Sequence, residues 1–122
     1  MGHSVQTKRI YEPKAAGDGQ RILVDRLWPR GVARAQASLD LWLKDVAPST
    51  QLRKWFGHSP DRWEEFQKRY FAELKASAAI QQLRDISRAG PVTLLYGAKD
   101  EVHNQAAALA TYLEHETGSA KT

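Results

Sequence analysis

The chain has 122 residues, of which 42% are hydrophobic and 26% charged, which suits one globular domain and excludes wholesale disorder or a fibrous repeat. It has no cysteine, which excludes disulfides, thiolate nucleophiles and cysteine-based metal sites. Its net charge is +4. No apolar run approaches the roughly 20 residues that span a bilayer, and no hydrophobic signal segment is present, so we expect a cytoplasmic protein.

Two strands are predicted in the first 30 residues. Lys8–Glu12 can form a short strand, and a turn-rich connection follows it. Arg21–Leu27 contains a continuous Ile-Leu-Val run, which is typical of a strand covered on both faces. This second strand is expected to end at Trp28–Gly31, because Pro29 lacks an N–H and Gly31 permits a sharp reversal.

The middle of the chain is predicted to be helical. Apolar residues recur at i, i+3, i+4 and i+7 over 38–48, with Ser38 as a cap, and a second short helix is expected over 49–57. A third helix should start at 59–61, where Ser-Pro-Asp supplies a cap, a proline and an acid. The apolar stripe loses phase at 75–77, so a further helix should follow and end by residue 90.

The last third is predicted to contain one strand and one helix. Pro91–Gly97 should form a buried strand that runs into the polar segment Ala98–Asn104. Asp100 can cap a final helix, which has its apolar positions at Val102, Ala106, Leu109 and Leu113. A short polar tail is expected from residue 117.

These elements predict a single α/β domain with a small mixed, mainly parallel sheet packed by helices. Two buried strands separated by a long helical excursion are best accommodated as parallel neighbours. The polar segments Asp25–Gly31 and Tyr96–Asn104 would then face each other at the carboxyl ends of the strands, where open sheets bind ligands. About eight residues connect the first strand to the second, which is short for a crossover. We therefore expect the first strand to be antiparallel.

The residues after the second strand suit binding of an oxyanion. Arg26 and Arg30 flank Asp25, and the planar guanidinium fork matches carboxylate or phosphate while the acid can act as a proton donor or acceptor. Alternatively, Asp25 and one arginine pair with each other and hold the loop. Trp28 can pack or stack on a substrate, and packing is favoured.

The second segment contains an acid–base candidate, His103, since an unperturbed imidazole titrates near neutrality. Asp100 lies three residues before it, and both can instead serve only in capping or stay exposed. Arg53 and His58 can close one side of the crevice. The candidate catalytic residues are Asp25, Asp100 and His103, and the candidate substrate-binding residues are Arg26, Trp28, Arg30, Arg53, His58, Tyr96, Lys99 and Asn104.

A metal site is chemically possible from His58, His103, Asp25 and Asp100, but no pair of them has a recognised ligand spacing. We therefore expect no metal and no cofactor. A glycine-rich phosphate loop and a Gly-x-Ser-x-Gly elbow are both missing, which argues against nucleoside triphosphatases and α/β-hydrolases.

Three segments closely resemble the YeaO-like branch of the domain of unknown function 488 family: RILVDRLWPRG (21–31), VAPSTQLRKWFGH (46–58) and LLYGAKDEVHN (94–104). The likeness extends from about Lys8 to Leu113. It implies a compact bacterial α/β domain without an established general activity. Other branches have a stretch ending in Cys-His-Arg after the corresponding strand, where this chain has Val102-His103-Asn104. Thiol chemistry is therefore not expected here.

Two function classes remain open from the sequence. The first is an enzyme acting on an anionic, phosphorylated or nucleotide-like small molecule, with arginines holding the anion and Asp25 or His103 handling a proton. The rival is a non-catalytic module that binds nucleic acid or a protein partner. Residues 1–61 hold ten Lys and Arg against six Asp and Glu, and residues 62–122 hold eight of each, so an acidic partner should meet the first half. The sequence mildly favours the enzyme, since it contains no nucleic-acid motif.

Overall fold

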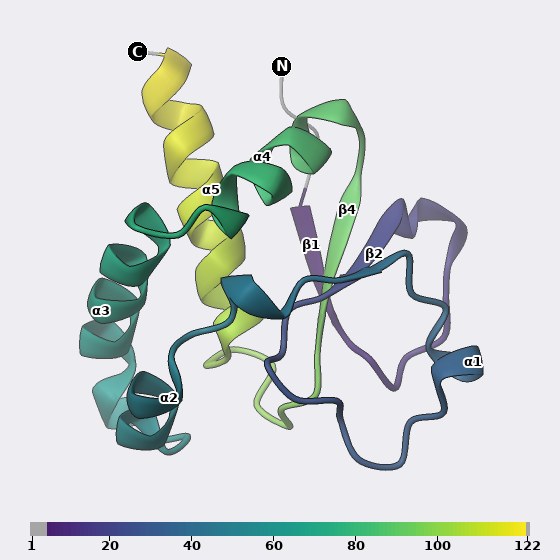
Figure 1. Cartoon of the computed structure of the whole chain (residues 1–122), viewed down its shortest axis with the longest axis horizontal. Helices are drawn as coiled ribbons and strands as arrows, with labels where there is room; N and C mark the ends of the chain where they lie inside the picture. The colour runs from purple at the N-terminus through teal and green to yellow at the C-terminus, as the bar shows by residue number, and fades with distance from the viewer. Residues whose placement is uncertain (1–4, 122) are drawn as a thin grey trace.

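A four-stranded parallel sheet forms the centre of the molecule, in the strand order β1-β4-β2-β3 (Figure 1). This computed structural model describes the backbone of residues 5–121 and the side chains of residues 5–114. The strands are β1 (Val5–Arg9), β2 (Gln20–Leu23), β3 (Leu41–Trp42) and β4 (Val92–Tyr96). The predicted α/β class with a mainly parallel sheet is confirmed.

The prediction that the first strand is antiparallel is wrong. β1 pairs with β4 in parallel, from Val5 opposite Val92 to Arg9 opposite Tyr96. Residues 10–19 then return along the sheet to start β2. Ten extended residues reach about 33 Å, whereas a five-residue strand is only about 17 Å long, so the chain can turn back without a crossover helix.

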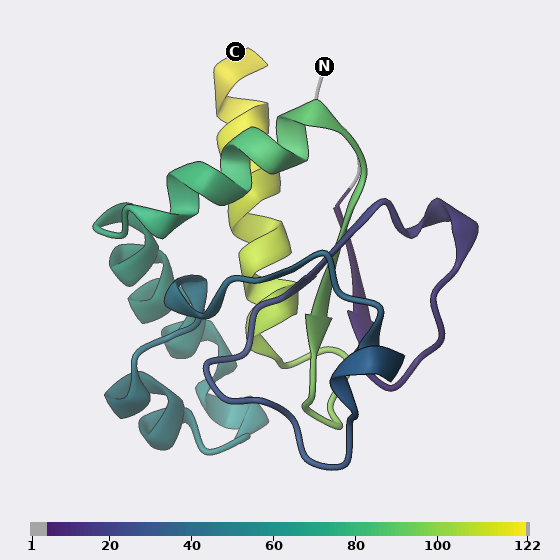
Figure 2. The same cartoon turned by 45° about the vertical axis from the view of Figure 1, so that its right-hand side comes forward.

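Helices cover the two faces of the sheet unequally (Figures 1 and 2). The helices are α1 (Arg34–Ala37), α2 (Thr50–Phe56), α3 (Trp63–Lys75), α4 (Ala79–Ala89) and α5 (Gln105–Lys121), with short 3₁₀ turns η1 (Ala16–Asp18), η2 (Lys44–Val46) and η3 (Pro60–Arg62). Helices α2 to α5 lie on one side of the sheet. The other side is crossed by the connection between β2 and β3, residues 24–40, which contains α1 and is called the α1 segment below. Within residues 5–121, no helix combines the length and apolarity needed to cross a membrane.

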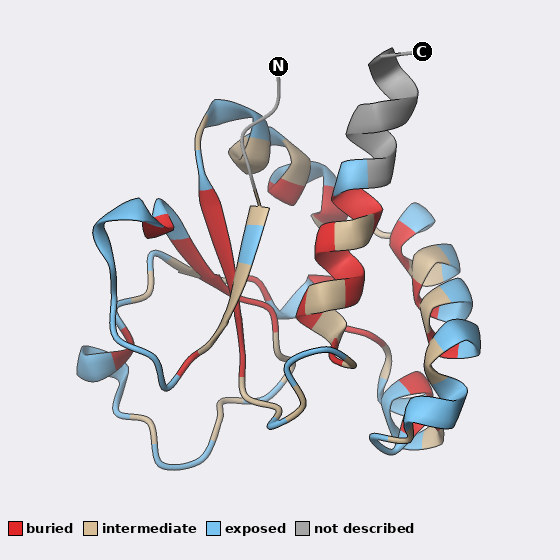
Figure 3. Cartoon of the chain, turned by 180° about the vertical axis from the view of Figure 1, so that it is seen from behind, coloured by how far each residue is buried: buried red, intermediate tan, exposed pale blue. Residues whose placement is uncertain are grey.

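The alternating side chains of the central strands build two cores. Ile22 and Leu94 face helices α2 to α5, while Leu23 and Leu95 face the α1 segment, as expected where successive side chains point to opposite faces. Figure 3 shows the buried residues gathered along the central strands and α5. Both faces of the sheet are therefore covered, which explains the continuous apolar run in the second strand.

The predicted helix over 38–48 is wrong. α1 ends at Ala37, Ser38 takes a left-handed conformation with φ 52°, and Leu41–Trp42 forms β3 beside β2. Side chains 39 and 42 pack in the smaller core, whereas 41, 43 and 46 pack in the larger one. The apolar residues thus serve two faces, and their helix-like spacing is coincidental.

The other predicted helices are present, but two of them start later than predicted: the Ser-Pro-Asp segment forms η3 without a side-chain cap from Ser59, so α3 starts at Trp63, and α5 starts at Gln105. Ser49 caps α2 by accepting a hydrogen bond from the Leu52 amide at 3.1 Å, and Gly57 ends the helix in a left-handed conformation. The predicted break separates α3, which ends at Lys75, from α4. Helix α5 continues to Lys121, so it runs into the stretch predicted as a polar tail, where side chains are not described; residue 122 lies outside the described residues.

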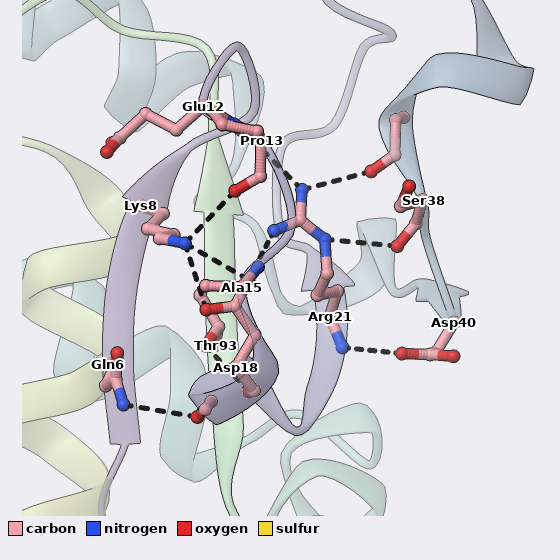
Figure 4. Close-up of polar contacts among 12 residues, drawn as sticks. Gln6, Lys8, Glu12, Pro13, Ala15, Asp18, Arg21, Ser38, Asp40 and Thr93 are labelled. Atoms are coloured by element: carbon pink, nitrogen blue, oxygen red, sulfur yellow. Dashed lines mark hydrogen bonds and ion pairs between the residues drawn. The ribbon is translucent and has the colours of Figure 1, made fainter.

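A buried ionic network ties the α1 segment to the sheet (Figure 4). Asp18 and Arg21 are only 2% and 1% exposed. Asp18 pairs with Lys8 at 3.0 Å and with Arg21 at 2.6 Å. Arg21 also donates to the carbonyl oxygens of Ala37 and Ser38, both at 3.1 Å. These contacts join β1, η1 and β2 to the end of α1 on the face that has few helices.

Candidate functional site

A pocket of about 490 Å³ lies at the carboxyl ends of β2 and β4. These strands pair in parallel, so the segments that follow them leave the sheet at the same edge. The two segments are in direct contact, because the Gly97 amide donates to Asp25 Oδ2 at 2.9 Å. The predicted meeting of residues 25–31 with residues 96–104 is therefore confirmed. The pocket is lined by Tyr11, Asp25, Arg26, Leu27, Trp28, Pro29, Arg30, Ala47, Pro48, Arg53, Phe56, His58, Phe66, Gly97, Ala98, His103, Asn104 and Gln105.

The carboxyl group of Asp25 is held from several sides. The Gly97 amide donates to one oxygen and the Gln105 side-chain amide to the other, while Trp42 Nε1 donates to the Asp25 backbone carbonyl at 2.7 Å. Burial raises the pKa of Asp25 to about 6, although the Gly97 amide, the charge of Arg53 and Gln105 oppose the rise. Asp25 can therefore exchange a proton near neutral pH.

Glycine at position 97 fits this close approach. A Cβ there would lie 3.1 Å from Asp25 Oδ2 and 3.2 Å from Pro29 Cβ. Any side chain would press on the carboxyl group and on the loop opposite. Glycine at this position thus permits the close approach of the two segments.

Arg26 binds backbone carbonyl oxygens of two other residues that line the pocket. Its guanidinium donates to the carbonyl oxygens of Ala47 at 3.1 Å and Pro48 at 3.3 Å. Among the side chains that the structure describes, no arginine forms an ion pair with Asp25. The alternative in which an Asp25–Arg pair holds the loop is thus not what the structure contains.

Two other arginines at the pocket keep their donors available. Arg30 and Arg53 are exposed, and neither guanidinium donates a hydrogen bond to any residue whose side chain is described. Arg53 lies in the last turn of α2, and His58 follows that helix with a left-handed φ of 58°. Cationic side chains from separate elements therefore reach one cavity.

His103 reaches the pocket with Asp100 behind it. Its Nδ1 lies 2.9 Å from Asp100 Oδ2, and its ring meets that of Trp63 edge-on at 5.3 Å. The backbone amides of His103 and Val102, followed by the imidazole, lower the pKa of Asp100 to about 2. An ionised Asp100 favours the tautomer with hydrogen on Nδ1, which leaves Nε2 as the nitrogen that can accept a proton.

Three predicted site residues do not line the pocket: Tyr96, Lys99 and Asp100. Tyr96 is buried in the larger core, and Lys99 is exposed.

The predicted cap of α5 is wrong. The Asp100 carboxylate does not cap the helix, because it accepts hydrogen bonds from the Val102 and His103 amides in the tight turn that precedes the helix. Asn104 is the cap, since its Oδ1 accepts from the Ala107 amide at 2.8 Å. Val102, predicted on the apolar face of that helix, lies in the turn and is exposed.

Trp28 lines the pocket and also packs, as favoured from the sequence. Its ring meets that of Trp42 at 5.3 Å with the planes 70° apart, and its Nε1 donates to the Val32 carbonyl at 2.7 Å.

Among the described residues, no three His, Cys, Asp or Glu side chains are grouped so that they could hold a metal ion.

Comparisons with known proteins identify the family. The family model described as Inactive DUF488-N3 subclade matches residues 4–122. The chain belongs to the DUF488 family. Uncharacterized protein YeaO of Escherichia coli is 44% identical over 111 residues, which cover 90% of this chain and 96% of that protein. Uncharacterized protein Rv3073c of Mycobacterium tuberculosis is 42% identical over 109 residues, which cover 89% and 92%. No solved structure matches the chain.

Tyr11 and Gln105 are pocket residues of this DUF488 chain that the sequence analysis missed. The end of β1 lies at the same edge as the ends of β2 and β4, so Tyr11 reaches the site. The antiparallel expectation for the first strand concealed this position. Gln105 directly follows Asn104, and recognising Asn104 as the helix cap would have placed Gln105 in the first turn of α5, next to the predicted site.

Proposed function

We propose that the pocket binds a small anionic molecule, phosphorylated or nucleotide-like, and that recognition rather than turnover is its role. The observation that carries this proposal is the guanidinium of Arg53, which lines the pocket without a hydrogen bond to the described side chains or backbone. Arginine forms strong, charge-assisted and often bidentate hydrogen bonds with phosphate and carboxylate groups.

The charge of the pocket wall supports the same conclusion. Arg26, Arg30 and Arg53 line the pocket, and Asp25 is the one acidic side chain among its described lining residues. Burial raises the pKa of Asp25 to about 6, so its repulsion of an anion falls as the pH drops through 6.

Recognition is placed ahead of catalysis for two reasons. The description of the matching family model calls its subclade inactive. In addition, the chain has Val102-His103-Asn104 where other DUF488 branches have a cysteine-containing stretch, so a thiol nucleophile is missing.

Catalysis remains a second candidate, because Asp25 and His103 with its Asp100 partner form an acid–base group around one pocket. On this candidate, His103→Ala would abolish turnover of an identified substrate and leave the fold intact. Unchanged turnover in that variant would remove His103 from the mechanism.

Arg53→Gln is expected to weaken binding of inorganic phosphate and ribose 5-phosphate by about tenfold or more, because one charge-assisted hydrogen bond contributes roughly 1.5–3 kcal/mol. Isothermal titration calorimetry measures the loss. Lys54→Gln is the matched control, since Lys54 is the next residue, is also exposed and does not line the pocket.

Equal weakening by the two variants would contradict the proposal, as would a wild-type protein that binds neither of these phosphate compounds nor any nucleoside monophosphate. Equal weakening would instead match the rival module for nucleic acid, in which charge counts more than position. A single-stranded RNA oligonucleotide would then bind at low salt and dissociate steeply as salt is added.

A further inference from the structure

The pocket is larger and more aromatic than an inorganic anion requires. Its volume of about 490 Å³ falls among pockets that enclose molecules of drug size. Rings contribute much of its wall, from Tyr11, Trp28, Phe56, His58, Phe66 and His103. An occupant that fills this space needs an apolar, flat part in addition to its charge.

Tyr11 is the ring best placed to receive a flat group. It is 48% exposed although it is large and apolar, and it follows β1 at the ligand edge of the sheet. Its hydroxyl donates to the Arg30 carbonyl oxygen at 3.1 Å, and the Arg9 guanidinium covers one face of the ring, 4.7 Å from the centroid. Among the described side chains, no ring pairs with Tyr11.

The support behind this ring is itself held in place. Arg9 Nε donates to the Ala98 carbonyl oxygen at 3.0 Å, which attaches the guanidinium to the segment after β4. The Tyr11 ring is therefore fixed at its hydroxyl and on one face without being buried. Such an arrangement leaves a positioned aromatic surface at the pocket.

We propose that the pocket takes a nucleoside monophosphate, or an anion of the same build, with its base stacked on Tyr11 and its phosphate at Arg53. Tyr11 belongs to the turn after β1, whereas Arg53 belongs to α2. A ligand that engages both needs a flat ring and an anionic group joined by a spacer, as base, ribose and phosphate supply. This inference rests on the proposed function, because it adds a ring to the anion that Arg53 binds.

The test compares ligands with and without the base. Isothermal titration calorimetry is performed on the wild type, Tyr11→Ala, Tyr11→Phe and Arg53→Gln, with inorganic phosphate, ribose 5-phosphate and the purine and pyrimidine nucleoside monophosphates. We expect at least one nucleoside monophosphate to bind about tenfold more tightly than ribose 5-phosphate, the size of one base–aromatic stack. Tyr11→Ala should remove that gain, and Tyr11→Phe should retain it.

The outcomes separate this inference from the proposed function. Equal binding of ribose 5-phosphate and all nucleoside monophosphates, with Arg53→Gln still weakening both, overturns the base site and leaves the anion site. An equal loss in Tyr11→Phe and Tyr11→Ala also overturns it, because Tyr11 would then act only through its hydroxyl bond to the Arg30 carbonyl. Binding of no phosphate compound overturns both proposals.

Discussion

Replacing Asp18 by alanine is expected to lower the free energy of unfolding by about 3–5 kcal/mol, the usual cost of removing one partner of a buried ion pair. Asp18 is 2% exposed and pairs with both Lys8 and Arg21. Without it, the Arg21 guanidinium stays buried with only carbonyl oxygens as partners. Urea unfolding followed by tryptophan fluorescence measures the difference.

The pH dependence of the same group gives a second measurement. Burial alone would raise the pKa of Asp18, but hydrogen bonds from the Ala15 amide, Lys8 and Arg21 together lower it to about 2. Since this folded-state pKa lies below the ordinary value of 3.8, the stabilisation is fully present above about pH 4 and is lost as the pH falls towards 2. Asp18→Ala should lack this contribution.

Asp61→Ala is the matched control, because Asp61 is exposed at the start of η3 and its loss should cost less than about 1 kcal/mol. If Asp18→Ala were no more destabilising than Asp61→Ala, the ionic network would not hold the α1 segment against the sheet.

The sequence predicted those elements whose apolar pattern is regular and ends at clear signals. β4 and α2 lie where expected, because β4 is buried throughout and α2 has a cap, one apolar face and a terminal glycine. Residues 38–48 were misassigned because apolar side chains that belong to two cores happen to fall at helical spacing along the chain. Asp18 was overlooked because Gly17-Asp18-Gly19 has the composition of an ordinary turn, and its partners lie in other elements.

The site was predictable to the extent that it follows from strand order. Parallel neighbours necessarily bring their carboxyl ends together, so Asp25 and His103 could be placed at one pocket from the sequence. Which arginine keeps its guanidinium free to bind an anion could not be deduced from the sequence. Arg26 and Arg53 have the same chemistry, but Arg26 lies within reach of the Ala47 and Pro48 carbonyl oxygens.

Asp25→Asn is expected to raise the free energy of unfolding at about pH 8 by up to about 3 kcal/mol, the equivalent of a two-unit pKa shift. At about pH 4 the substitution should change the free energy of unfolding little. Burial raises the folded-state pKa of Asp25 from 3.8 to about 6. The neutral carboxyl therefore favours folding below pH 3.8, and this contribution is lost as the pH rises through 6. Asparagine has the same shape and cannot ionise.

Unfolding free energies of the wild type, Asp25→Asn and the exposed control Asp61→Asn, measured across this range, test the sign. The difference in unfolding free energy between Asp25→Asn and the wild type should grow with pH, whereas the difference between Asp61→Asn and the wild type should not change with pH. A wild type that is more stable than Asp25→Asn at about pH 8 would show that the hydrogen bonds from Gly97 and Gln105 outweigh burial. A gain in stability on losing the carboxyl would instead indicate that Asp25 serves the pocket at a cost to the fold.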